Sequence, residues 1–162
     1  VVAQIRVSAG VVTGVTLLSG EEPFAGSCKT SLARWRLDPE EDGERLVVVH
    51  FRRPELYYAG ESDEAISGEP RNGRLAYPRS LVPPVYPANA LGKGSVVLQI
   101  DISNEGRVVE ARAVKSMGIL TDASVDAVKR WTFHPARDAS GRPAASKAYA
   151  VIVFRYPTIA GP

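Results

Sequence analysis

The sequence has few of the residues from which disulfides, metal centres and catalytic sites are built. One cysteine excludes an internal disulfide, and two histidines do not form a ligand cluster with the spacing of a zinc site. Cys28, His50 and His134 lie far apart in the sequence, so nothing indicates a catalytic Cys–His pair. Gly92-Lys93-Gly94 is too short for a phosphate-binding loop and precedes an expected strand. We therefore predict no metal, no cofactor and no enzymatic activity.

Long hydrophobic runs and a dense charge of one sign are also lacking. No apolar run approaches the ~20 residues of a membrane span, and no signal peptide is present. The net charge of +2 comes without the basic stripe of a nucleic-acid-binding protein, so we predict no nucleic-acid partner. The chain starts without Met and inside an expected strand, and we interpret it as a fragment or a processed form.

What is present is a short amphipathic helix that runs into an extended aromatic segment. Apolar and small residues recur at helical spacing and define one face: Leu120, Ala123, Ser124, Ala127, Val128 and Trp131. Pro135 requires the helix to have ended by His134. Trp131 is expected to anchor the core rather than to bind a ligand.

The same pattern occurs earlier in the chain, at Phe24, Ser27, Cys28, Ser31, Leu32 and Trp35. Residues 10–39 align with residues 106–135 at a constant offset without a gap, and Val47 to Pro54 resembles Ala150 to Pro157. An internal repeat of this length predicts two tandem copies of one structural module. Trp35 is then a second core anchor, and Cys28 a small buried hydrophobic residue.

Each module is predicted to have the element order β-β-α-β. Alternating or β-branched residues predict strands at 1–8, 11–19 and 46–53, and again at 96–103, 107–115 and 147–156. The turns at Ala9-Gly10 and Asn104-Glu105-Gly106 make the first two strands of each module a hairpin. If the helix runs back along the sheet and the chain crosses over the first strand, the third strand pairs with the first. The strand order is then 2-1-3. The third strand is then predicted to be an edge with unpaired backbone groups.

The predicted fold is α+β, with two tandem three-stranded, largely antiparallel sheets that each carry a helix on one face. We expect the first module at residues 1–54, a linker with some packed anchors at 55–82, and the second module at 83–158. Residues 88–91 are expected to form one helical turn before the second module. Whether the two modules align their edges or exchange strands stays open at this point.

The second module resembles the C-terminal domain of TonB-type energy transducers. The resemblance covers Val85 to Tyr156 and is weaker over residues 1–54, which suggests a degenerate first repeat. It rests on motifs in a fixed order: Tyr86-Pro87, Ala90, Gly94, the Val96–Ile102 strand, Gly106-Arg107-Val108, Ser116, Leu120, Ala123, Ala127-Val128, Trp131 to Ala136, Gly141-Arg142-Pro143 and Phe154. The transducers' membrane helix and proline-rich spacer are missing from this sequence.

The resemblance implies a periplasmic, non-enzymatic interaction domain that captures an extended TonB-box-like peptide of an outer-membrane receptor by strand addition, in energy-coupled transport. It also implies tethering to the inner membrane and contact with its energising complex through a missing N-terminal region. The expected partner-binding residues are Tyr86, Pro87, Tyr149, Ala150, Val151, Ile152, Val153, Phe154 and Arg155. Exposed faces of Tyr149, Val151, Val153 and Arg155 are expected to supply specificity.

Two alternatives stay open. In one, the domain is structural or a scaffold, and its sheet edges pair with each other or with a second chain, including a homodimer. In the other, it is a sensory or regulatory domain of a membrane protein. The distinguishing feature is whether the edge of the last strand is open.

Overall fold

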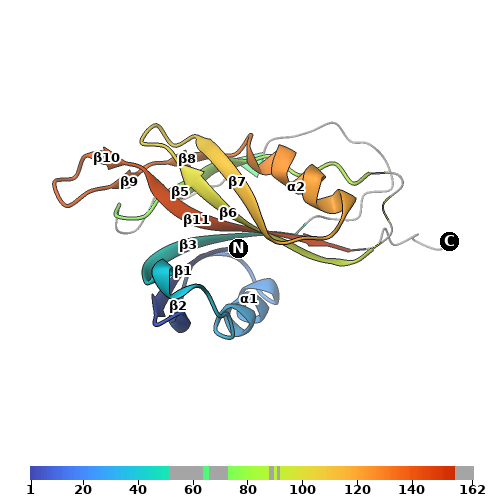
Figure 1. Ribbon diagram of the computed structural model, residues 1–162, viewed down its shortest axis with the longest axis horizontal. Coiled ribbons are helices and arrows are strands. Elements are labelled where there is room, and N and C mark those ends of the chain that lie inside the picture. The colour runs from blue at the N-terminus through green and yellow to red at the C-terminus, as the bar shows by residue number, and fades with distance from the viewer. Residues whose placement is uncertain (52–63, 66–72, 88–89, 91, 156–162) are drawn as a thin grey trace.

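One six-stranded sheet runs through the whole molecule (Figure 1). The computed structural model describes residues 1–51, 64–65, 73–87, 90 and 92–155. The strand order is β2 (Val11–Ser19), β1 (Val2–Ser8), β3 (Gly43–Phe51), β11 (Ser146–Phe154), β6 (Gly94–Ile102) and β7 (Val108–Lys115). All neighbours are antiparallel except β3 and β11, which are parallel.

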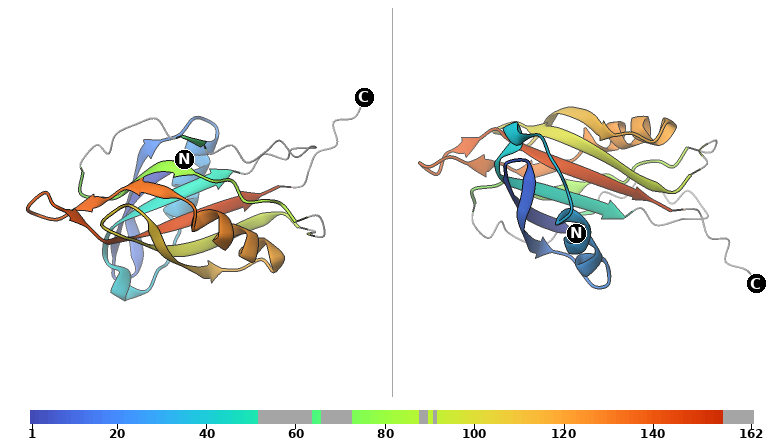
Figure 2. Two further views of the ribbon diagram at one scale, coloured as in Figure 1. Left: turned by 90° about the horizontal axis from the view of Figure 1, so that it is seen from above. Right: turned by 60° about the horizontal axis from the view of Figure 1, so that its bottom comes forward.

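The two helices cover opposite faces of this sheet (Figures 1 and 2). Helix α1 (Phe24–Leu32) contributes Cys28 and Leu32 to a core cluster that we call the α1 face. Helix α2 (Ile119–Val128) contributes Leu120 and Val128 to a larger cluster, the α2 face. No helix in the described part of the chain is long and apolar enough to cross a membrane.

Shorter elements complete the α2 face. A three-stranded sheet has the order β4 (Glu64–Ala65), β5 (Tyr77–Leu81) and β8 (Thr132–His134). A small hairpin joins β9 (Ala136–Arg137) to β10 (Pro143–Ala144). Outside this face, a 3-10 turn, η1 (Pro39–Glu41), precedes β3. The predicted extended segment after the second helix is therefore confirmed as β8 and β9. Residues 88, 89 and 91 of the predicted helical turn lie outside the described residues.

The α+β class and the order of the hairpin strands agree with the sequence-based expectation. β2, β1 and β3 lie in the order 2-1-3, and so do β7, β6 and β11. The prediction that the third strands form edges is wrong, because β3 and β11 lie beside each other at the centre of one sheet. Both strands are strongly apolar, and pairing them removes two edges from solvent. The domain boundaries at 54 and 83 stay predictions.

The register of the β3–β11 pair explains why the helices lie on opposite faces. Val47 corresponds to Ala150 in the sequence comparison, yet in the sheet Val47 is opposite Tyr149. A shift of one residue reverses the face to which each side chain points. Accordingly Val47 lies in the cluster of the α1 face and Ala150 in that of the α2 face. Because of the same one-residue shift, α1 and α2, which correspond in sequence, lie on opposite faces of the sheet.

Both hairpins are fastened to the segment that follows the helix by the same backbone contact. The Leu37 N–H donates to the Gly10 carbonyl, and the Phe133 N–H donates to the Gly106 carbonyl, each at 2.8 Å. Both glycines have positive φ, at +72° and +79°. At each of them a Cβ would collide with a carbonyl oxygen, of Leu37 or of Phe133. The two turns therefore require glycine.

Replacing Gly106 with alanine is expected to destabilise the protein by about 1–3 kcal/mol through backbone strain, with the collision at Phe133 added to it. Urea unfolding followed by circular dichroism measures the loss. Gly141 is the matched control, since its φ is +80° and nothing lies within 4 Å of a Cβ placed there. Equal losses for Gly106→Ala and Gly141→Ala would contradict the close contact.

Candidate functional site

The predicted binding strand, β11, is paired on both sides. Residues Ala148 to Val153 pair in parallel with Leu46 to Phe51 of β3, and residues Ser146 to Phe154 pair antiparallel with β6. An added strand needs unpaired N–H and C=O groups on one side of β11. In this structure β3 takes up that side over most of the strand.

The side chains of β11 alternate between the two faces of the sheet. Ala150, Ile152 and Phe154 lie in the α2-face cluster, and Tyr149 and Val151 lie in the α1-face cluster. Tyr149 and Val151 are 3% and 7% exposed, so the expectation that they present free faces to a partner is wrong. The cause is the first part of the chain, which covers this face.

Contacts from that first part account for the burial of Tyr149. The Trp35 ring meets the Tyr149 ring edge-on, with centroids 5.8 Å apart. Burial is the main cause that raises the pKa of the Tyr149 phenol, and the nearby charge of Glu41 adds to it. Tyr149 is therefore a neutral core residue at physiological pH.

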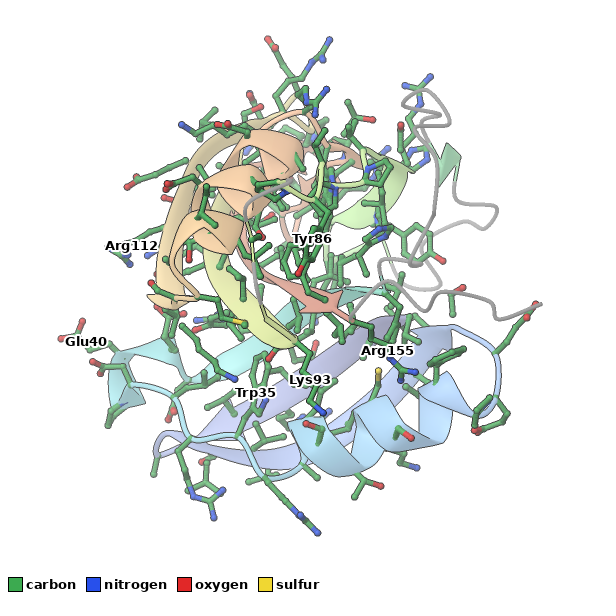
Figure 3. All side chains as sticks on the ribbon, turned by 90° about the vertical axis from the view of Figure 1, so that its right-hand side faces the viewer. Trp35, Glu40, Tyr86, Lys93, Arg112 and Arg155 are labelled. Carbon is green, nitrogen blue, oxygen red and sulfur yellow. The ribbon has the colours of Figure 1, made fainter. Side chains whose placement is uncertain are left out.

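The remaining predicted site residues lie toward one end of β11. Tyr86 packs on the Phe154 ring with centroids 5.9 Å apart, and its hydroxyl donates to the Gly92 carbonyl at 3.0 Å. Pro87 follows it and is half-buried. Val153 is half-buried, while Arg155 is exposed with its guanidinium 6.0 Å from the Phe24 ring centroid. Figure 3 shows Tyr86 on the α2 side of the sheet and Arg155 and Trp35 toward α1.

The structure thus brings the nine predicted residues to one strand and its flank, but places them on two opposite faces. A partner bound along the α1 face meets different side chains from one bound along the α2 face. Their role in partner binding stays a proposal.

The other candidates from the sequence are core residues. Trp131 is 1% exposed, and its indole N–H donates to the Val82 carbonyl at 2.9 Å. His50 is buried with its ring 6.4 Å from that of Trp131, whereas His134 is exposed on β8. Cys28 is buried, and burial raises the pKa of its thiol, which disfavours the reactive thiolate. Among the described residues, no group of three metal-ligating side chains is placed to hold an ion.

A buried polar network, missed in the sequence, joins the two parts of the chain. The Gln99 amide donates to a Glu41 carboxylate oxygen at 2.7 Å and accepts a hydrogen bond from Arg112. Glu41 also pairs with Arg45 at 3.3 Å, and both of these side chains are largely buried. Gln99 looked like an outward-facing position of an alternating strand, and only the long-range pairing of β3 with β11 brings Glu41 to it.

Replacing Gln99 with leucine is expected to cost about 1–3 kcal/mol, because the largely buried Glu41 loses a hydrogen-bond donor. Thermal unfolding and urea unfolding report the loss. Ser95→Ala is the control, since it removes an exposed hydrogen bond to Lys115 between the same two strands, and is expected to change stability by no more than ~0.5 kcal/mol. A Gln99→Leu protein as stable as the control would contradict the role of the network.

A comparison with protein families now identifies the second part of the chain. Residues 82–156 match the family model described as the Gram-negative bacterial TonB protein C-terminal. These residues are a TonB C-terminal domain. They span β6, β7, α2, β8, β9, β10 and β11, so the matched region supplies half of the six-stranded sheet together with α2. A comparison with curated proteins finds no match.

The match of residues 82–156 to this family supports coarse conclusions. The family consists of non-enzymatic energy-transducer domains, and its members interact with outer-membrane receptors. A Gram-negative TonB C-terminal domain implies a periplasmic location and a role in protein interaction. In this structure β3 pairs with β11, the last strand of the TonB domain. This pairing determines whether β11 has a free edge for a partner.

Proposed function

We propose that the chain is a TonB-type periplasmic interaction domain in which β3 occupies, within the same molecule, the edge of β11. It then acts as a scaffold in the resting state rather than as a constitutive peptide-capture domain. The parallel pairing of Leu46–Phe51 with Ala148–Val153 carries this proposal.

The burial of β3 indicates that its pairing is strong. Leu46, Val47 and Val48 are 1%, 0% and 0% exposed, and they divide between the two faces of the sheet. Each such side chain contributes about 1.5–3 kcal/mol when fully buried. A short peptide that displaces β3 has to replace this burial on both faces, which a single extended segment does poorly.

We further propose that residues 1–54 are a degenerate second copy of the TonB module. The matching contacts at Gly10–Leu37 and Gly106–Phe133 support this, as does the shared 2-1-3 strand order. A third strand equivalent to β11 is a suitable occupant of the β11 edge, because both have apolar side chains on both faces.

A second candidate function is favoured by the same pairing. Since β3 is itself an extended strand bound in parallel, the β11 edge accepts such a strand, and a receptor peptide can take its place after β3 is released. In that case Tyr149 to Arg155, with Tyr86 and Pro87 beside Phe154, line the bound peptide. Tethering to the inner membrane and contact with its energising complex also remain proposals.

A backbone-amide NMR titration with a short extended outer-membrane-receptor peptide separates the two candidates. The scaffold proposal predicts slowly exchanging amides in Ala148–Phe154 that do not shift with added peptide. Shifts concentrated on β11, with loss of protection on β3, would favour peptide capture after β3 release and count against the scaffold.

A locked variant serves as the control for this titration. Val48 and Ala150 are opposite each other and both 0% exposed, on the face away from Cys28. Cysteines at both positions have the Cα separation of neighbouring strands, which suits a disulfide. The oxidised variant holds β3 on β11, so peptide shifts that persist after oxidation must arise at another surface.

A further inference from the structure

With β3 and β11 paired, the open edges of the main sheet among the described residues belong to β2 and β7. β7 is the more apolar of the two edges. Val109 and Val114 are 64% and 58% exposed, whereas β2 exposes one large hydrophobic residue, Val11, at 37%. Val11 is also engaged in a bridge to Arg36, next to the first hairpin turn.

The two exposed valines lie at the register shifts of β7. Val108 is opposite Ile102 and Glu110 is opposite Asp101, so Val109 is skipped in the pairing with β6. Val114 is skipped in the same way between Ala113 and Lys115. Between the two bulges, residues 110–113 form a regular segment that pairs with β6 on one side only.

At one end of this regular segment two carboxylates from neighbouring strands face each other. Glu110 and Asp101 are directly opposite each other, and like charges in this arrangement are destabilising. The described residues contain no hydrogen bond or ion pair to either side chain. Glu110 lies on the same face as Arg112, which bonds Gln99 on the α1 side of the sheet. A cation placed beyond the edge opposite Glu110 would relieve the repulsion.

We propose that β7 pairs antiparallel with β7 of a second copy, about a two-fold axis at Ala111. Antiparallel self-pairing at this register sets Glu110 opposite Arg112 of the second copy, and Arg112 opposite its Glu110. Val109 comes opposite Ala113 of the second copy, which covers the more exposed valine. The contact uses the same patch on both molecules, so it closes as a dimer and does not propagate.

The surroundings limit the length of this contact. A bridge between Arg107 and Thr132 brings β8 to the start of the strand, so pairing is confined to about Val109–Ala113. A contact of this size falls below the standard interface area, and the dimer is therefore expected to be weak and concentration-dependent. The dimer does not depend on what occupies the β11 edge, because β6 separates β7 from β11.

Sedimentation equilibrium over a concentration series tests the proposal with Glu110→Arg. In the monomer the new arginine faces Asp101, so the fold is expected to keep or gain stability. In the dimer four arginines meet at one edge, and the dissociation constant is expected to rise at least about tenfold.

Glu105→Arg is the matched control, because it makes the same charge change at an exposed position in the hairpin turn. The proposal predicts that Glu105→Arg dimerises as the wild type does. A wild type that is monomeric up to ~1 mM overturns the proposal. A wild-type dimer that Glu110→Arg leaves unchanged overturns it as well, and places the contact elsewhere.

Discussion

Replacing Trp131 with alanine is expected to lower the free energy of unfolding by about 3–5 kcal/mol. Trp131 is 1% exposed and belongs to the core cluster of the α2 face. Its indole N–H is bonded to Val82, and its ring lies against His50 of β3. The substitution leaves a cavity, an unpaired carbonyl at Val82 and a loosened contact between the two parts of the chain.

Thermal unfolding measures this effect, and a fall of roughly 6–20 °C in the midpoint is expected for a chain of this length. Trp35→Ala is the natural control, because Trp35 occupies the corresponding sequence position but is only half-buried. Its loss is expected to be clearly smaller. If the two variants were equally destabilised, the unequal burial of the tryptophans would not describe the molecule in solution.

Replacing Val151 with proline is expected to unfold the protein. Val151 lies in the middle of β11, opposite Val49 of β3 on one side and Val97 of β6 on the other. Proline removes a ladder hydrogen bond and is not accommodated in a central strand. The expected result is loss of the cooperative unfolding transition and of native circular dichroism at 25 °C.

Proline at Val109 is the matched control for this experiment. Val109 is a bulge residue in the edge strand β7, where proline is tolerated far better. Val109→Pro is therefore expected to fold. A Val151→Pro protein that kept its native spectrum would mean that β11 has an open side, as first expected from the sequence.

The sequence was informative where structure depends on neighbours along the chain. Helical spacing from Leu120 to Trp131 located α2, and alternating or β-branched residues located the strands of both hairpins. Glycines at positions 10 and 106 marked the hairpin turns. Each of these features is set by a few adjacent residues, so a periodic pattern is enough to predict them.

The pairing of β3 with β11 was not predictable in this way. The apolar character of both strands fits an edge strand of a small sheet, a peptide-bound strand or a central strand of a larger sheet. Only the energy of burying Val47 and Val48 on both faces decides among these, and it depends on segments about a hundred residues away. The Gln99–Glu41 network was missed for the same reason.

The position of β3 changes how this TonB domain is expected to meet its partners. Six of the nine predicted binding residues, Tyr149 to Phe154, lie in β11, but a strand of the same chain already uses the hydrogen bonds that a receptor peptide needs. Partner binding at β11 then requires an exchange of strands, whereas the β7 edge is available without one.

The most direct test of this account is a search for cross-strand nuclear Overhauser effects between β3 and β11 in the isotopically labelled protein. The expected result is the set of backbone effects of a parallel pair, with Leu46 near Ala148 and Val49 near Val151, at all protein concentrations. Absence of these effects, together with rapid exchange of the β11 amides, would contradict it and leave β11 as an open edge.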